Sequence, residues 1–272
     1  MNTELSVPEL QQIARRLRRH IVTMIANAGS GHPGGSLSSV EILTTLYFRI
    51  LQYNPADPHW TDRDRFILSK GHAAPVLYAT LAEAGYFPTD ELSTLRKLGS
   101  RLQGHTDHNI PGVEMSAGSL GQGLSFGIGC ALAGRLNKQS YRVYVLMGDG
   151  ECEEGQVWEA AMAAVHFKVD NLMAIVDRNG LQNDARTRDV MNLEPFSDKW
   201  RASGWHVIDI DGHDFNQLIE SFEHAKTVKR QPTMVIAHTI KGKGVSFMEN
   251  NVDFHGKAPN AAQLEIALKE LA

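Results

Sequence analysis

The chain of 272 residues carries 27 Lys and Arg against 31 Asp and Glu, which gives a formal net charge of -4 at pH 7. This acidic balance argues against nucleic-acid binding, and we expect no membrane span and no signal peptide, because no apolar run is long enough for either. The only two cysteines, Cys130 and Cys152, exclude a disulfide framework or a multi-cysteine metal cluster and indicate a reducing, cytoplasmic environment.

The first predicted elements are two helices joined by a glycine-rich loop. Ser6 and Glu9 have the spacing of a capping box and predict a helix that runs to about Ala28. Ser38 and Glu41 have the same spacing and predict the start of the second helix. Four arginines on the first helix are more typical of a solvated face than of a nucleic-acid site in so acidic a chain: Arg15, Arg16, Arg18 and Arg19.

An apolar run at residues 65–69 predicts a buried strand, followed by a helix over 73–84 and a shorter helix after Thr89. Residues 99–118 are predicted to be mostly loop, and 120–137 helix. Glycine costs up to about 1 kcal/mol at a helix position, so the glycines of this last helix need a reason. Close approach of another backbone, such as a helix at a subunit interface, would supply one for Gly121, Gly123, Gly127 and Gly129.

The second half of the chain alternates between apolar strands and helices. Strands are predicted over 142–147, 172–177, 206–209 and 233–238, and the main helices over 156–167 and 215–226. The strands are continuous apolar runs, as expected when helices cover both faces of a parallel sheet. We therefore predict a single α/β domain over residues 1–272, with a doubly wound, mostly parallel sheet. Such sheets bind ligands at the carboxyl ends of their strands.

A polar motif directly follows the predicted strand 142–147. Gly148, Asp149 and Gly150 occupy this position, and Asn179 follows the next strand, 30 residues after Asp149. A carboxylate and a carboxamide at neighbouring strand ends suit Mg²⁺ or Ca²⁺, with positions left for phosphate oxygens. Gly150 lets the backbone approach a phosphate, and the helix that follows offers its N-terminus to the anion. Taken alone, the motif could also be a simple strand-to-helix turn.

The segment from Gly148 to Gln182 resembles the thiamine diphosphate motif of transketolases. Four further segments resemble transketolase segments in the same order along the chain: SGHPGGSLSSVEIL, RDRFILSKGHAAPVLYA, GHTDHNIPGVEMSAGSLGQGLSFGIG and FHGKAP. The resemblance covers nearly the whole chain and implies the thiamine diphosphate-binding fold, specifically its diphosphate-binding domain. It also implies that Asp149 and Asn179 bind the metal through their side chains and Leu181 through its carbonyl. The metal would then hold the diphosphate of the cofactor.

The resemblance implies roles for further residues. Cofactor contacts are expected from His72, Gly118, Leu120, Gly150, Glu154, Asn179 and His255. Glu154 and Glu159 also match acids near the dimer interface, for which a solvated first helical turn is the alternative. The glycine order at 118–123 differs from the dinucleotide-binding fingerprint, and 241–244 lacks the flanking residues of a P-loop. The latter segment resembles a mobile loop over the cofactor.

Histidines carry the proton chemistry that we expect. Five of the 12 adjoin a glycine, a position that core packing does not explain: His32, His72, His105, His213 and His255. Histidine can donate and accept protons near neutral pH. The resemblance places His72 near the diphosphate and implies catalytic roles for His32, His105 and His255 around the donor sugar. Residues 105–108 could instead form a metal cluster, and His213 has no assigned role.

One catalytic part is expected on another chain. In transketolases a glutamate beside the cofactor's pyrimidine, aromatic residues around that ring and arginines for the sugar phosphate lie in the next domain. We therefore expect the N-terminal subunit of a split transketolase, with the pyrimidine-binding and C-terminal domains on a separate polypeptide and two copies of each chain. The implied reaction moves a two-carbon ketol group from a ketose phosphate to an aldose phosphate, as in the pentose phosphate pathway.

Three alternatives remain at this point. The first is a related thiamine diphosphate enzyme, either similar to deoxyxylulose-phosphate synthase or a transketolase for specialised sugars, although His32 and His105 favour a ketose donor over pyruvate. The second is a non-catalytic regulatory paralogue, which the intact Asp149, Asn179 and histidines argue against. The third is a dinucleotide-binding oxidoreductase, which the missing fingerprint disfavours.

Overall fold

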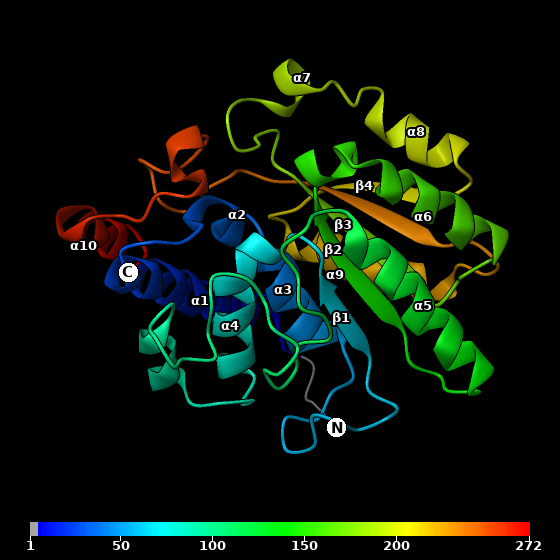
Figure 1. Ribbon diagram of the computed structural model, residues 1–272, viewed down its shortest axis with the longest axis horizontal. Helices are drawn as coiled ribbons and strands as arrows, with labels where there is room; N and C mark the ends of the chain where they lie inside the picture. Colours follow the sequence, from blue (N-terminus) through cyan, green and yellow to red (C-terminus); the bar gives the residue numbers. More distant parts are fainter. Residues whose placement is uncertain (1–4) are drawn as a thin grey trace.

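The computed structural model describes residues 5–272. Five parallel strands form one sheet in the order β1-β2-β3-β5-β4, which confirms the predicted fold class (Figure 1). The strands are β1 (Arg65–Leu68), β2 (Val143–Gly148), β3 (Leu172–Arg178), β4 (His206–Asp211) and β5 (Thr233–His238). Over residues 5–272, every helix is too short or too polar to cross a membrane.

Helices surround the sheet at positions close to those predicted. They are α1 (Val7–Ala28), α2 (Pro33–Leu37), α3 (Val40–Thr45), α4 (Ala74–Glu83), α5 (Gln122–Leu136), α6 (Gly155–His166), α7 (Thr187–Val190), α8 (Phe196–Ala202), α9 (Phe215–Thr227) and α10 (Ala261–Glu270). A π-helical turn at Leu46–Ile50 follows α3, and short 3₁₀ helices occupy Gly71–Ala73, Thr89–Thr94, Gly150–Glu153 and Val252–His255. Two of these turns directly follow strand ends, so they place motif residues at that edge of the sheet.

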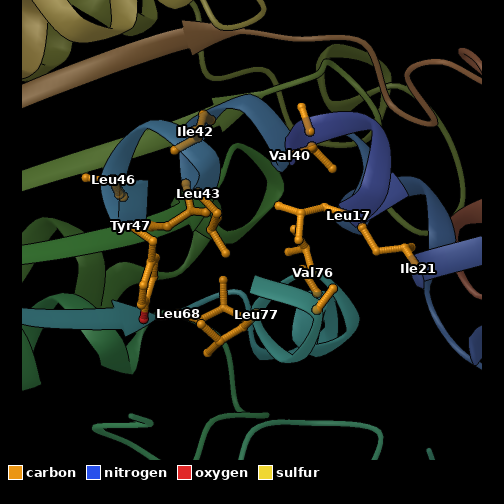
Figure 2. Packing of buried hydrophobic residues seen from close by; sticks show 14 of the residues in the cluster. Leu17, Ile21, Val40, Ile42, Leu43, Leu46, Tyr47, Leu68, Val76 and Leu77 are labelled. Carbon is orange, nitrogen blue, oxygen red and sulfur yellow. The ribbon is translucent and has the colours of Figure 1, made fainter. Parts of the chain in front are cut away.

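Alternate residues of each strand pack into two separate cores. Tyr144 and Leu146 of β2 face the core shared with α1, α3, α4 and α9, whereas Val145 and Met147 face the core shared with α5, α6 and α8. Figure 2 shows part of the first core, where side chains from α1, α3, α4 and β1 meet. Burial on both faces explains why the strands read as continuous apolar runs.

The α1 helix begins as predicted, but one of its arginines is not solvated. The Glu9 carboxylate accepts a hydrogen bond from the Ser6 backbone N–H at 2.7 Å, which closes the expected cap. Arg18 is buried, contrary to the prediction for the arginine face, because it forms an ion pair with the equally buried Glu41 at 2.7 Å. The helix therefore uses this arginine to attach to α3.

The predicted capping box at Ser38 and Glu41 is wrong. The Ser38 hydroxyl donates to the buried Asp177 carboxylate at 2.6 Å and to the Gly35 carbonyl, and α3 begins after Ser39 without a side-chain cap. Glu41 is engaged with Arg18 instead of turning back to the helix start. The tertiary ion pair and hydrogen bonds thus outweigh the local pattern at this helix start.

Packing within the chain explains most of the glycines near α5. Gly121 is the N-cap with φ 81°, a conformation that favours glycine. A Cβ at Gly123 would collide with Ser69, and one at Gly127 with Val145, so the helix lies directly on β1 and β2. At Gly129, by contrast, a Cβ would have no neighbour within 4 Å among the described residues. The expected interface explanation is therefore unnecessary for two of the helical glycines and remains open for Gly129.

Candidate functional site

A cavity of about 250 Å³ lies at the carboxyl ends of the central strands. This strand-end cavity is lined by Gly35, Lys70, His72, Leu120, Gly148, Asp149, Gly150, Glu151, Glu153, Glu154, Asn179, Leu181, Gln182, Asn183, Lys241 and His255. These residues come from loops that follow β1, β2, β3 and β5 and from the starts of α2 and α5. The parallel sheet thus gathers motifs that are far apart in sequence, as a ligand site at its carboxyl edge requires.

The three predicted metal ligands lie together in the wall of this cavity. The two carboxylate oxygens of Asp149 accept hydrogen bonds from the backbone N–H groups of Gly150, at 3.0 Å, and Gly180, at 2.6 Å. Asn179 Oδ1 accepts from the Leu181 N–H at 3.1 Å, which fixes the carboxamide on the same turn. The Leu181 carbonyl accepts from Lys241 Nζ at 2.9 Å. Carboxylate, carboxamide and carbonyl oxygens therefore lie on adjoining turns.

The donor set fits a hard divalent cation next to a diphosphate. Burial, followed by the charge of Asp177, raises the pKa of Asp149 to about 6, and a bound cation would offset that cost. Among the described residues, the buried Gln182 Oε1 and Glu153 Oε1 in the cavity wall have no hydrogen-bond partner. A Cβ at Gly150 would lie 3.0 Å from Gln182, so glycine keeps this turn close to its neighbour. The residues thus provide oxygen ligands and free acceptors in one wall.

Two buried lysines, Lys70 and Lys241, also line the cavity and bring positive charge to it. Lys70 Nζ donates to the Gly35 carbonyl at 2.9 Å and pairs with Asp177, and Lys241 Nζ lies 2.7 Å from His255 Nδ1. Burial and the nearby Lys70 charge lower the pKa of Lys241 to about 8, so the amine is still mostly protonated at pH 7. Neither lysine was predicted as a site residue. Lys70 stands two residues before His72, and this proximity could have identified it as a site residue.

Four glycine-flanked histidines form a cluster at the cavity, and two of them, His72 and His255, line it. The centroid of the His32 ring lies 5.4 Å from that of His72, 5.8 Å from that of His105 and 5.7 Å from that of His255. The rings of His72 and His255 stack at 5.1 Å. The clustering of these histidines agrees with their predicted common site, although their individual roles remain predictions.

The environment keeps these imidazoles neutral. Burial, with smaller contributions from His105, Arg96 and Lys241, lowers the pKa of His32 to about 4. Burial and the Lys241 charge lower the pKa of His255 to about 3. A neutral imidazole has one nitrogen that donates and one that accepts a hydrogen bond. The cluster can therefore both donate hydrogen bonds to sugar hydroxyls and accept them at neutral pH.

Not every predicted site residue lines the strand-end cavity. His72, Leu120, Gly150, Glu154, Asn179 and His255 do, whereas His32, His105 and Gly118 do not. Gly118 lies beside His105, since a Cβ added to this glycine would be 3.8 Å from the imidazole ring. His32 Nδ1 is buried and, among the described residues, has no partner. These three residues form an outer zone of the site, next to the cavity. Glu159 is exposed on α6.

A buried carboxylate that sequence reasoning missed connects three of the motif loops. Glu151 accepts hydrogen bonds from the Gly121 N–H at 2.9 Å, the Gly148 N–H at 3.0 Å and the Ser69 hydroxyl. The loops after β1 and β2 and the start of α5 are thereby held together. Its pattern in sequence, an acid just after a GDG motif, suggests a solvated helix start and gives no sign of burial.

The metal-cluster alternative for residues 105–108 has no support. Across residues 5–272, no three His, Cys, Asp or Glu side chains are grouped as metal ligands. A second cavity of about 580 Å³ adjoins the first, and the two share Asp149, Asn179 and Leu181. Three arginines also line it: Arg178, Arg186 and Arg188.

Comparison with known proteins places this geometry among thiamine diphosphate enzymes. The family described as "Transketolase, thiamine diphosphate binding domain" matches residues 10–271. An apulose-4-phosphate transketolase subunit from Phocaeicola vulgatus is 42% identical over 268 residues, which cover 98% of this chain and 95% of that protein. The 6-deoxy-6-sulfo-D-fructose transketolase subunit SqwG of Clostridium sp. is 44% identical, covering 97% of this chain and 96% of that protein.

Solved structures give the same result. Transketolase from Campylobacter jejuni superposes with a TM-score of 0.93 at 31% identity, covering 98% of this chain and 43% of that one. Transketolase from Leishmania mexicana superposes with a TM-score of 0.91 at 31% identity, covering 99% of this chain and 42% of that one. The chain therefore corresponds to about two fifths of those longer transketolase chains.

Proposed function

The chain belongs to the transketolase family, and on that premise we propose that it is the thiamine diphosphate-binding subunit of a split transketolase. The observation that carries the proposal is a single cavity lined both by the oxygen ligands Asp149 and Asn179 and by two members of the histidine cluster, with His32 next to those two. The oxygen ligands suit a metal-bound diphosphate, and the histidines suit proton transfer on a sugar. Two free cysteines support a reducing, cytoplasmic location.

In this proposal the residues of the chain bind the cofactor and move protons. Asp149, Asn179 and the Leu181 carbonyl would hold Mg²⁺, and Lys241 would neutralise part of the diphosphate charge. Thiamine diphosphate supplies the electron sink that allows the bond next to a ketose carbonyl to break. The neutral rings of His32 and His255 accept and return protons of the sugar hydroxyls. The protein thus contributes placement and proton transfer.

The rest of the active site is proposed to come from a partner polypeptide. Three relatives of about the same length as this chain are named as transketolase subunits. The surface of α5 and α6 includes the exposed apolar side chains of Phe126, Leu136 and Met162, and a Cβ at Gly129 of α5 would have no neighbour within 4 Å among the described residues. We assign this surface to contacts in an assembly with two copies of each chain, with Glu154 and Glu159 near the interface.

The purified chain is expected to have no transketolase activity by itself. The residues that would activate the pyrimidine side of the cofactor are proposed to lie on the partner. Mixing the chain with the product of the adjacent reading frame should restore turnover, measured by coupled assay of the aldose phosphate formed. Robust turnover by the chain alone, with the partner absent from the preparation by mass spectrometry, would contradict the proposal.

The donor is proposed to be a ketose that carries an anionic group. Two relatives are named for apulose-4-phosphate and 6-deoxy-6-sulfo-D-fructose, which carry a phosphate and a sulfonate respectively. Sugar phosphates of the pentose phosphate pathway are the first donors to test. A donor screen of the assembled enzyme, with phosphorylated, sulfonated and uncharged ketoses and with pyruvate, separates these candidates. If pyruvate were the one donor used among those tested, the alternative similar to deoxyxylulose-phosphate synthase would be favoured.

His105→Ala is expected to impair the use of donor more than the binding of cofactor. His105 is exposed and lies outside the strand-end cavity, with its ring 5.8 Å from that of His32. Loss of a positioned acid or base typically costs about 10²- to 10⁴-fold, so kcat/KM for the donor should fall in that range. The affinity for thiamine diphosphate, measured by calorimetric titration, should change by less than about threefold. A loss confined to cofactor affinity would contradict the assignment.

A further inference from the structure

His213, the glycine-flanked histidine without an assigned role, is partly buried and belongs to a hydrogen-bonded chain of side chains whose other members, Glu41 and Arg18, are buried. Its Nδ1 lies 2.9 Å from Glu41 Oε2, and its Nε2 lies 2.9 Å from the backbone nitrogen of Ile240. Glu41 in turn pairs with Arg18 at 2.7 Å, and Arg18 Nε donates to the Lys243 carbonyl at 3.0 Å. The chain thus links α1 and α3 to the segment after β5.

The hydrogen-bond directions in this chain are determined by its backbone partners. A backbone N–H only donates, so Nε2 of His213 accepts from Ile240, and the ring proton on Nδ1 donates to Glu41. Burial opposes the charge on Glu41, but Arg18 and His213 lower its pKa below the ordinary value, so the carboxylate is ionised. Every member therefore has a partner, as a buried polar network must.

The backbone groups held by this network lie on either side of Lys241 in the sequence. Ile240 precedes Lys241 and Lys243 follows it by two residues, and each is bonded by one end of the network. Lys241 is only 2% exposed, and its ammonium group reaches the strand-end cavity between the Leu181 carbonyl and His255. The network does not line this cavity itself. Its effect on the site must therefore pass through the segment 240–243.

We propose that His213, oriented by Glu41 and Arg18, is a positioning residue that fixes Lys241 for contact with the diphosphate of the cofactor. This inference rests on the proposed function, because it takes the strand-end cavity to be the diphosphate site. Without His213, the Ile240 N–H loses its acceptor and the carboxylate of Glu41 loses a donor. The segment 240–243 then has fewer constraints, and Lys241 spends less time in the cavity.

The test compares two substitutions of His213 with a matched control in the full-length chain. His213→Phe removes both hydrogen bonds, whereas His213→Gln can accept from Ile240 and donate to Glu41. The control is His206→Phe, at the opposite end of β4 and outside the cavity. Calorimetric titration with thiamine diphosphate and Mg²⁺ should show about a tenfold weaker affinity for His213→Phe, and less than about twofold change for the other two.

A double-variant cycle separates positioning from a general structural role. If His213 acts through Lys241, adding His213→Phe to Lys241→Met should weaken the affinity by less than about twofold. A tenfold loss in both backgrounds, or no loss in either, would overturn the proposal. Equal weakening in His206→Phe would also overturn it, since the effect would then reflect general destabilisation.

Hydrogen exchange tests the inference independently of cofactor binding. Amides of residues 240–243 should exchange faster in His213→Phe than in the wild type, His213→Gln or His206→Phe. If the wild type failed to bind thiamine diphosphate, the cofactor assignment of the proposed function would fail. The exchange data would then still decide whether His213 fixes this segment, and unchanged exchange would overturn the inference.

Discussion

Asp149→Ala is expected to abolish cofactor binding, with the affinity for magnesium-bound thiamine diphosphate reduced about 100-fold or more. Changes to residues that merely orient a metal ligand cost about 10- to 100-fold, and Asp149 is proposed as a ligand itself. Its carboxylate also accepts from Gly150 and Gly180, so the substitution releases both turns that hold the oxygen set. Calorimetric titration of the assembled enzyme measures the loss.

A charge-matched control separates metal binding from general electrostatics. Asp62 is an exposed acid in the loop before β1, and Asp62→Ala removes one negative charge at a residue that does not line the cavity. Its effect on the affinity should stay within about twofold. Titrations with Mg²⁺, with Ca²⁺ and with chelator should show metal-dependent binding in the wild type and none in Asp149→Ala. Unchanged affinity in Asp149→Ala would refute the ligand assignment.

The sheet and the oxygen end of the cavity follow from local sequence patterns. Continuous apolar runs identified β1, β2, β3 and β5, because helices bury both faces of these strands, whereas the edge strand β4 carries two aspartates and is only partly buried. Asp149 and Asn179 could be paired because they follow strands that lie next to each other, and parallel strands end at one edge. Strands of this kind are predictable because burial on both faces produces the same apolar pattern in each of them.

The buried polar contacts were not predictable in this way. Asp177 looked like the last residue of a strand, but it binds Lys70, 107 residues away in sequence, and accepts from Ser38, 139 residues away. Glu41 and His213 are separated by 172 residues. Such contacts depend on which elements the fold brings together. Capping patterns and helix faces are local, and they failed at Ser38 and Arg18 where a tertiary partner was stronger.

The second large effect is expected on stability, from the buried ion pair of Lys70 and Asp177. Both side chains are nearly inaccessible, with exposed fractions of 1% and 0%. Asp177→Ala leaves the Lys70 ammonium buried without its partner, which typically costs about 3–5 kcal/mol in the free energy of unfolding. Three hydroxyl groups lose an acceptor as well: those of Ser38, Ser39 and Thr239. Urea unfolding followed by circular dichroism measures the loss.

The control for this pair is Asp209→Ala in the edge strand β4. Asp209 pairs with Arg201 at 2.9 Å but is one third exposed, so its loss should cost at most about 1 kcal/mol. The double variant Lys70→Met with Asp177→Leu removes both charges and should be more stable than Asp177→Ala, since no buried charge is left unpaired. Equal stability of the double and single variants would contradict this account.

The pH dependence of stability provides a separate check on the contribution of the Asp177 carboxylate. Burial raises the pKa of Asp177, but Lys70 and the hydroxyl hydrogen bonds of Ser38 and Thr239 more than offset this effect and hold the pKa below the ordinary value. A depressed pKa means that this carboxylate stabilises the fold fully above its unfolded pKa of about 4, and that the stabilisation is lost as the pH falls through the folded value. The difference between wild type and Asp177→Ala should therefore narrow below about pH 4. Because the Asp177 charge also helps to raise the pKa of Asp149 to about 6, this difference should become constant only above about pH 7. A difference that did not narrow below about pH 4 would show that another group carries the effect.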